Sequence, residues 1–173
     1  MGLGLVSGNL HFKEVKVSSL PKSILNYEAK FEDGYFLDLN LRYQPIDSFG
    51  AFFKISHSFD REVKRGAKSG SDATFSFNIS EFNLNYRFKD FYLFSGANSY
   101  QAFLKPSCNC QGDLETKLGS QFGIGYVKDS YVFDFYYQTL NLKFKEYDSD
   151  QKVFIDYGEG VFQNLNFVFS YLF

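Results

Sequence analysis

The sequence predicts an all-β protein, an eight-stranded antiparallel up-and-down transmembrane β-barrel, from three observations. Aromatic residues make up 21% of the chain, with 23 Phe and 13 Tyr, and both types favour strands. Apolar and polar residues alternate with the period of two that a strand with two different faces requires. Short and long polar connections also alternate, which is typical of barrels that cross an outer membrane. At 173 residues, the chain fits one barrel domain over residues 1–173.

The clearest strand runs from Gly34 to Gln44 and separates two faces. Its apolar face consists of Tyr35, Leu37, Leu39, Leu41 and Tyr43. A second alternating run, residues 51–59, follows a polar connection. Placing Tyr43 opposite Ala51 brings the apolar faces of both runs to the same side, as cross-strand packing requires. These two runs are predicted to form a hairpin.

Two further hairpins follow from the same pattern. Their turns are predicted at Lys89-Asp90 and Asp129-Ser130, and their arms are residues 82–88 with 91–97 and residues 120–126 with 131–137. Upstream of the first arm, Phe75, Phe77 and Ile79 lie on odd positions, whereas the apolar residues of the arm lie on even ones. The sequence therefore predicts a β-bulge near Ser80-Glu81, because one inserted residue would exchange the faces.

The two terminal strands are predicted near Gly4–Phe12 and over the last residues up to Phe173. In the first strand Val6, Leu10 and Phe12 are expected to face outward, although its glycines make it the least regular. Four long polar segments are expected to form external loops, and these are residues 13–23, 60–73, 101–117 and 145–156. Three short turns would then lie at the opposite end of the barrel, beside both termini.

The apolar faces are expected to point outward into lipid. Mean hydropathy is −0.26 and no apolar run is long enough for a membrane helix, but barrel strands give only a weak hydropathy signal. Tyrosines at the ends of the apolar faces would form the interfacial girdle, namely Tyr35, Tyr43, Tyr86, Tyr126, Tyr131 and Tyr171. The alternative is a soluble lipocalin-like binding barrel with the same faces turned inward. The bulky aromatic stripes and the absence of Trp argue against it.

The last strand carries a family resemblance. Its alternating aromatic residues Phe169, Tyr171 and Phe173 look like the C-terminal assembly signal of bacterial outer-membrane proteins. With the loop alternation, the chain resembles the small eight-stranded group of the OmpA transmembrane domain, OmpX and the Opa-type barrels. The resemblance implies a mature chain delivered to the bacterial outer membrane and inserted by the barrel-assembly machinery. The protein is expected to be a monomer. No signal peptide is visible, so the numbering is expected to start at the mature chain, with Met1 replacing a removed leader.

An eight-stranded barrel leaves an interior just wide enough for side chains to fill it. Charged residues on the inward face are therefore expected to form a lumen polar network, because an unpaired charge in an enclosed space is costly. The candidates are Asp38, Arg42, Lys54, Glu81, Arg87 and Asp134. The alternative is a narrow gated conduit for small solutes.

The expected role is structural or based on surface interaction. A basic loop could contact lipopolysaccharide phosphates by charge-assisted hydrogen bonds, and its residues are Arg61, Lys64, Arg65 and Lys68. Loops on a rigid barrel could also serve adhesion. A formal charge of −2 argues against a general nucleic-acid binder.

Enzymatic activity is a less favoured alternative, as a lipid A acyl hydrolase or transferase. His11 and His57 are the two histidines, and the Ser56-His57-Ser58 sequence places His57 on the opposite face from both serines, so no catalytic set is assigned. Cys108 and Cys110 could form a small loop disulfide or remain free thiols, and they lack the partners of a structural zinc site. No metal or cofactor is predicted.

Overall fold

The computed structural model describes residues 1–19, 24–64, 71–106, 110–148 and 152–173, and this part of the chain is dominated by antiparallel strands. No helix within these ranges is long and apolar enough to cross a membrane. The strands are β1 (Gly2–Val17), β2 (Ile24–Tyr43), β3 (Phe49–Ser58), β4 (Arg61–Lys64), β5 (Ser71–Phe88), β6 (Phe91–Pro106), β7 (Cys110–Thr116), β8 (Gly119–Lys128), β9 (Tyr131–Asp148) and β10 (Val153–Tyr171).

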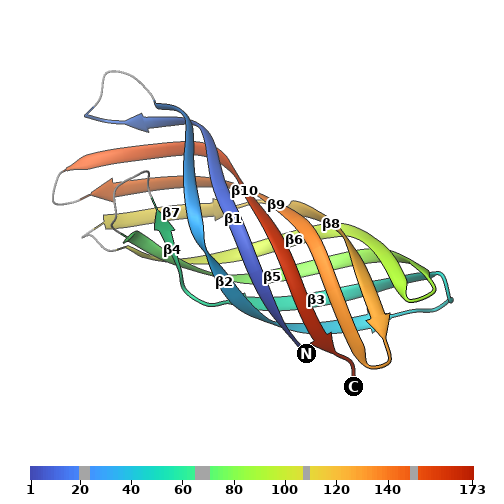
Figure 1. The fold of residues 1–173 in the computed structure, drawn as a ribbon. Helices are drawn as coiled ribbons and strands as arrows, with labels where there is room; N and C mark the ends of the chain where they lie inside the picture. Colours follow the sequence, from blue (N-terminus) through green and yellow to red (C-terminus); the bar gives the residue numbers. More distant parts are fainter. Residues whose placement is uncertain (20–23, 65–70, 107–109, 149–151) are drawn as a thin grey trace.

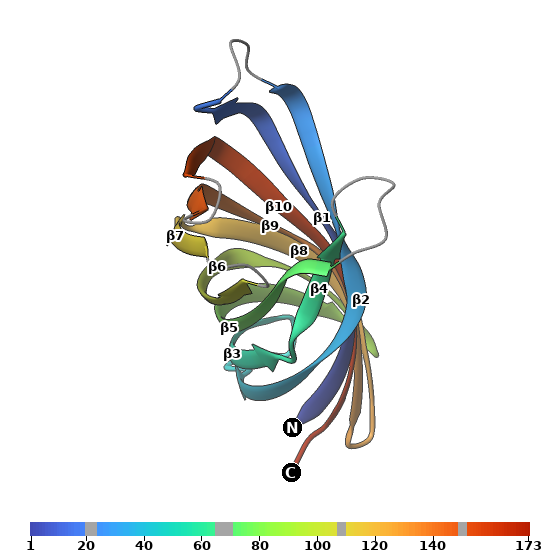
Figure 2. The same cartoon turned by 90° about the vertical axis from the view of Figure 1, so that its left-hand side faces the viewer.

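The sheet closes into a barrel because β1 pairs with both β2 and β10, between which it lies in Figures 1 and 2. Strands β3 and β4 together occupy one of the eight strand positions of the ring, because each of them pairs with β2 on one side and with β5 on the other. Strands β7 and β8 likewise both pair with β9. The result is the predicted antiparallel ring of eight strands.

The registers predicted for the first two hairpins and the turn predicted for the third are confirmed, although Ser120 of the third pairs with Thr139 and not with Tyr137. Tyr43 lies opposite Ala51, Phe88 lies opposite Phe91, and Lys128 lies opposite Tyr131. Lys89 and Asp129 have positive φ angles of 57° and 55°, as the tight turns between paired strands require. Both chain termini lie at one end of the barrel (Figure 1). We call the half of the barrel that contains the termini and these turns the terminal half, and the other the distal half.

The described residues of the four segments predicted as long external loops are mostly strand, so the prediction was wrong for these residues. Strand β1 continues to Val17 and β9 continues to Asp148, while β2 alone has 20 residues. A tilted strand needs only about 9–11 residues to cross a bilayer. The hairpins therefore continue well past the length of a membrane crossing, with polar side chains that the sequence pattern presented as loop residues.

The predicted orientation of the first strand was also wrong. Val6, Leu10 and Phe12 face the lumen, with exposed fractions of 6%, 7% and 1%, while Leu3 and Leu5 face outward. Periodicity defines which residues share a face but does not say which face points inward. The neighbouring strands decide the orientation, because β1 pairs in register with the last strand, whose Phe167 lies opposite Leu5.

The β-bulge predicted near Ser80-Glu81 is absent, because β5 pairs there without a shift in register. Ser80 lies opposite Ile55 on β3 and opposite Ser99 on β6. The alternation therefore continues unbroken, and Phe75, Phe77 and Ile79 lie inside the barrel. The apolar residues change sides along this strand because they face lipid in the terminal half and the lumen in the distal half.

Two apolar clusters fill the lumen. The distal lumen cluster has as buried members Leu10, Phe12, Val15, Ala29, Phe75, Phe77, Ile79, Tyr100, Leu140, Leu142, Phe144, Tyr157 and Phe162. The terminal lumen cluster consists of Val6, Phe36, Phe52, Tyr92, Phe94, Val132, Tyr136 and Val168. Charged and amide side chains lie among the aromatic residues of the terminal half and form the network described next.

Candidate functional site

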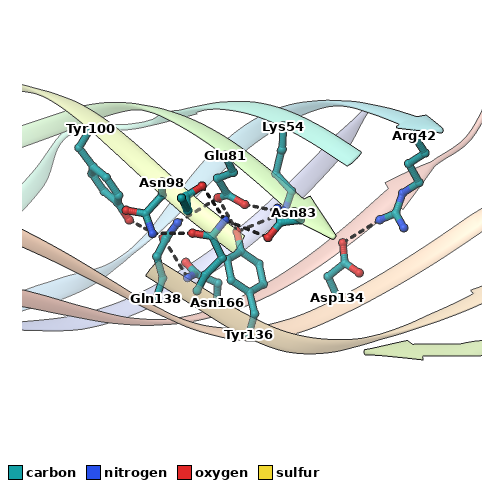
Figure 3. A network of polar contacts seen from close by, with 12 residues as sticks. Arg42, Lys54, Glu81, Asn83, Asn98, Tyr100, Asp134, Tyr136, Gln138 and Asn166 are labelled. Carbon is teal, nitrogen blue, oxygen red and sulfur yellow. Dashed lines mark hydrogen bonds and ion pairs between the residues drawn. The ribbon is translucent and has the colours of Figure 1, made fainter. Parts of the chain in front are cut away.

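A buried ion pair joins two neighbouring strands inside the barrel. Lys54 on β3 lies opposite Glu81 on β5, and Lys54 Nζ is 3.7 Å from Glu81 Oε2, with both side chains fully buried. Lys54 Nζ also donates a hydrogen bond of 3.2 Å to the Tyr136 hydroxyl, which reaches across from β9. Gln138 Nε2 donates to Glu81 Oε1 at 3.1 Å. Side chains from three strands therefore meet across the lumen (Figure 3).

A second ion pair lies closer to the termini. Arg42 on β2 donates from Nη2 to Asp134 Oδ2 on β9 over 3.1 Å. Its guanidinium carbon lies 4.7 Å from the ring centre of Phe52 and 4.8 Å from that of Tyr92, within the range of cation–π attraction. The Tyr92 hydroxyl donates to the other oxygen of Asp134. The carboxylate therefore has a charged and a neutral donor.

The two remaining residues of the predicted lumen network lie apart from these pairs. Asp38 is buried, with 3% of its surface exposed, and neither carboxylate oxygen has a hydrogen-bond partner. Arg87 lies at the turn and donates from Nε to the Lys89 carbonyl at 2.9 Å. Sequence reasoning missed the neutral partners Tyr92, Tyr136 and Gln138, although their inward parity was visible, because it considered charged residues alone.

The outer surface of the terminal half is an apolar belt. All six tyrosines predicted for the girdle face outward, and they are Tyr35, Tyr43, Tyr86, Tyr126, Tyr131 and Tyr171. All but Tyr35 lie near the turns and termini, where Tyr131 contacts Tyr171 with ring centres 5.5 Å apart. Phe173 is fully exposed, and Phe169 faces outward beside Tyr131.

The belt has the height of a bilayer core. Along β10 the outward apolar residues run from Phe173 back to Leu165 and give way to the exposed Gln163. The belt ends between Leu165 and Gln163, so it covers about eight to ten residue steps from Phe173, which at about 3.3 Å each and a tilt of about 40° correspond to about 20–25 Å. That matches the outward apolar band of membrane barrels, which is about 25 Å tall. Residues of β10 on the distal side of Gln163 therefore lie at or above the level of the lipid headgroups.

Beyond the belt, the outer wall carries charged side chains. Glu159 on β10 accepts a hydrogen bond from Lys117 Nζ at 3.1 Å and lies 3.7 Å from Lys143 Nζ. The hydrogen bond from Lys117, together with the charges of both lysines, lowers the pKa of this exposed carboxyl group. A hollow of about 320 Å³ next to Glu159 is lined by His11, Lys13, Lys117, Asn141, Leu142, Glu159, Gly160 and Val161. We call this hollow, together with Lys143, the lysine wall site.

The comparisons with solved structures identify the fold. The chain matches the outer membrane protein AlkL with a TM-score of 0.60 and 13% identity, covering 100% of this chain and 90% of that one. It matches the outer membrane protein OprG from Pseudomonas aeruginosa with a TM-score of 0.54 and 16% identity, covering 99% and 97%. The chain has the fold of small outer-membrane β-barrels. No protein-family model and no curated protein matches the sequence.

Of the basic loop predicted for this outer-membrane barrel, the side chain of Arg61 alone lies in the described part of the structure, and it does not face the solvent as expected. Arg61 has 3% of its surface exposed and donates from Nε to the Glu32 carbonyl at 2.9 Å, so it lies inside the wall. Lys64 belongs to β4, but its side chain is outside the described part of the structure, as are Arg65 and Lys68. Arg61 occupies an inward position of β4, which the sequence analysis had treated as a loop.

The two histidines face outward. His57 Nδ1 lies 2.7 Å from Asn78 Oδ1, whereas its neighbours Ser56 and Ser58 are buried in the lumen. His11, which faces out between Leu10 and Phe12, lies 3.1 Å from Glu28 Oε1. Neither contact brings a histidine to a serine. Within the described ranges, no three His, Cys, Asp or Glu side chains gather as a metal site would require. The Cys108–Cys110 disulfide prediction falls on side chains outside those ranges.

Proposed function

We propose that this protein is an outer-membrane barrel with a filled lumen that acts at the membrane surface, where its lysine wall site binds lipopolysaccharide phosphates. The observation that carries the proposal is the position of Lys13, Lys117 and Lys143 on the outer wall just beyond the apolar belt. Phosphate groups at the membrane surface would lie at this height. Lysine ammonium groups bind phosphate oxygens through charge-assisted hydrogen bonds.

The lumen supports a role at the outer surface in preference to transport. Lys54, Glu81 and Tyr136 are each buried to 98% or more and meet across the barrel, with aromatic clusters on both sides along its axis. Opening a conduit would separate the Lys54–Glu81 pair within a low-dielectric interior. Removing one partner of a buried ion pair typically costs about 3–5 kcal/mol. Opening a conduit by separating Lys54 from Glu81 would therefore be unfavourable.

The charge balance of the wall site favours an anionic ligand. Glu159 contacts Lys117 and Lys143, Lys13 lines the same hollow, and Glu115 lies opposite Lys143 on β7, so three lysines stand against two exposed carboxylates. Glu159 holds the two ammonium groups close together, which favours a ligand with several negative oxygens. Exposed pairs of this kind contribute little stability by themselves, so the lysines are free to exchange Glu159 for a phosphate.

The test compares the double variant Lys117→Gln/Lys143→Gln with Lys89→Gln/Lys128→Gln, which removes two exposed lysines at the opposite end. Urea unfolding midpoints are measured in neutral detergent with lipopolysaccharide, with dephosphorylated lipopolysaccharide, and without either. Because a ligand that binds only the folded state stabilises it, intact lipopolysaccharide should raise the midpoint of the wild type and of the Lys89/Lys128 control. The Lys117/Lys143 variant should lose this increase. An equal increase in all three proteins, or with the dephosphorylated lipid, would contradict the proposal.

A further inference from the structure

One carboxylate inside the barrel has no counter-charge in contact with it. Asp38 lies in the terminal half with 3% of its surface exposed, and both of its carboxylate oxygens are buried without a hydrogen-bond partner. Such a group is rare in folded proteins, because removing a charge from water without pairing it is costly. The buried carboxylate of Asp38 therefore requires an explanation.

Two serine hydroxyls near Asp38 are also buried without a hydrogen-bond partner. Ser56 lies directly opposite Asp38 on β3, and Ser170 lies on the other side of Gly2 from Asp38, on β10. Ser56 and Asp38 are directly paired, with Cβ atoms about 4.5–5.5 Å apart, whereas Ser170 approaches Asp38 across the space next to Gly2.

Gly2 makes this convergence possible. A Cβ atom at Gly2 would collide with Asp38 Oδ1 and with Ser170 Oγ, so both oxygens lean into the space that a side chain would otherwise occupy. The row Ser170, Gly2, Asp38 and Ser56 thus presents one carboxylate and two hydroxyls across four neighbouring strands. Both amide atoms of Asn40, which is two residues further along β2 on the same face, are also buried without a partner.

The nearby cations are already engaged. Lys54 pairs with Glu81 and donates to Tyr136, and Arg42 pairs with Asp134, so neither cation forms an ion pair with Asp38, although Arg42 Nε is buried without a hydrogen-bond partner. The amino group of Met1 also lies near, but it is exposed and donates to the Tyr171 carbonyl at 2.9 Å. Water screens such an exposed charge, so the buried positive charge that acts on Asp38 is that of Lys54, which is already paired with Glu81.

We infer that Asp38 and Ser170, which converge next to Gly2, form the core of a binding site for one alkali-metal cation in the lumen near the barrel's terminal end, with Ser56 beside Asp38. Carboxylate and hydroxyl oxygens are the hard ligands that such cations prefer over nitrogen or sulfur. A single carboxylate balances one positive charge. A divalent ion would leave a second charge uncompensated in a buried site, and calcium sites usually draw on more than one carboxylate among their 6–8 oxygen ligands.

The test uses sodium-23 NMR on the folded barrel in neutral detergent, with Na⁺ as the probe. Exchange into a protein site broadens the sodium resonance, and added K⁺ should reverse the broadening whereas bulky N-methylglucamine at equal ionic strength should not. Asp38→Asn should weaken sodium binding by about tenfold or more, which corresponds to about 1.4 kcal/mol. Asp47→Asn is the matched control, because it removes an exposed carboxylate from a turn and should leave the broadening unchanged.

Two charge-preserving variants separate a site from a general effect of negative charge. Gly2→Ala places a methyl group where Asp38 Oδ1 and Ser170 Oγ converge, and Ser170→Ala removes one ligand, so both should reduce sodium binding several-fold while retaining Asp38. All variants should first show heat-modifiable migration as evidence of folding. Equal broadening in wild type, Asp38→Asn and Gly2→Ala would overturn the inference, as would reversal by N-methylglucamine. None of these outcomes depends on lipopolysaccharide binding.

Discussion

The two halves of the barrel have opposite polarity. In the terminal half of β9, Phe133 and Phe135 face outward while Asp134 and Gln138 face the lumen. In the distal half of the same strand, Leu140 and Leu142 face the lumen while Lys143 faces outward. The backbone register does not shift between the two stretches, since each of these residues is paired in sequence with β10.

The inversion shows that the surrounding solvent, and not the sheet geometry, sets the pattern. Where lipid surrounds the barrel, apolar side chains are stable outside and polar groups collect inside, where they pair with one another. Where water surrounds it, the barrel follows the rule for soluble barrels and buries its apolar side chains in the lumen. The distal half therefore has the interior expected of the soluble barrel that the sequence left as an alternative.

The largest expected effect tests whether the distal lumen is a true hydrophobic core. Leu140→Ala removes a fully buried side chain and should destabilise the protein by about 2–5 kcal/mol, because the cavity left behind cannot be filled by solvent or lipid. Leu118 lies on the outer wall with 71% of its surface exposed, so Leu118→Ala should change the free energy of unfolding by less than about 0.5 kcal/mol. Urea unfolding in detergent measures both. Similar values for the two variants would mean that the distal lumen is not packed.

The parts of the fold predicted from sequence are those governed by local pattern. Tyr43 opposite Ala51 followed from alternation and the length of the connection, and the turn at Lys89-Asp90 followed from two alternating arms. Alternation does not reveal which face meets which solvent. Phe75 and Phe77 were therefore explained by a bulge, although their strand runs straight from water-exposed to lipid-exposed surroundings.

The candidate sites were predictable only in part, because their contacts cross the barrel. Asp134 and Arg42 are 92 positions apart in the sequence and meet only because β2 and β9 face each other across the lumen. Parity could nominate both residues, but it could not separate this pair from the unpaired Asp38. The lysine wall site was missed altogether, because Lys13 and Lys117 lie in segments that were expected to be loops and their approach to Lys143 depends on strand pairing far apart in the sequence.

An intermediate effect sharpens the boundary between the two halves. Phe135→Arg places a charge in the apolar belt and should cost up to about 2–4 kcal/mol, the range for arginine on the lipid face near the bilayer midplane. Asn141→Arg, three outward positions further along the same strand, should cost less than about 1 kcal/mol because it lies at or beyond the interface. Refolding into phospholipid vesicles followed by urea titration gives both values. A large cost for Asn141→Arg would place the lipid boundary further toward the distal end.

The smallest effect examines the outer wall itself. Since the lysines lower the pKa of folded Glu159, its ionised form stabilises the folded protein at pH values above its unfolded pKa of about 4.3, and this contribution is lost as pH falls through the lower folded pKa. The unfolding midpoint of the wild type should therefore fall slightly more than that of Glu159→Gln between about pH 5 and pH 3. Because the group is exposed to water, about 1 M salt should remove most of the difference. A large difference that resists salt would show that the lysine wall site is shielded from water, and the polarity of the distal half would then need another cause.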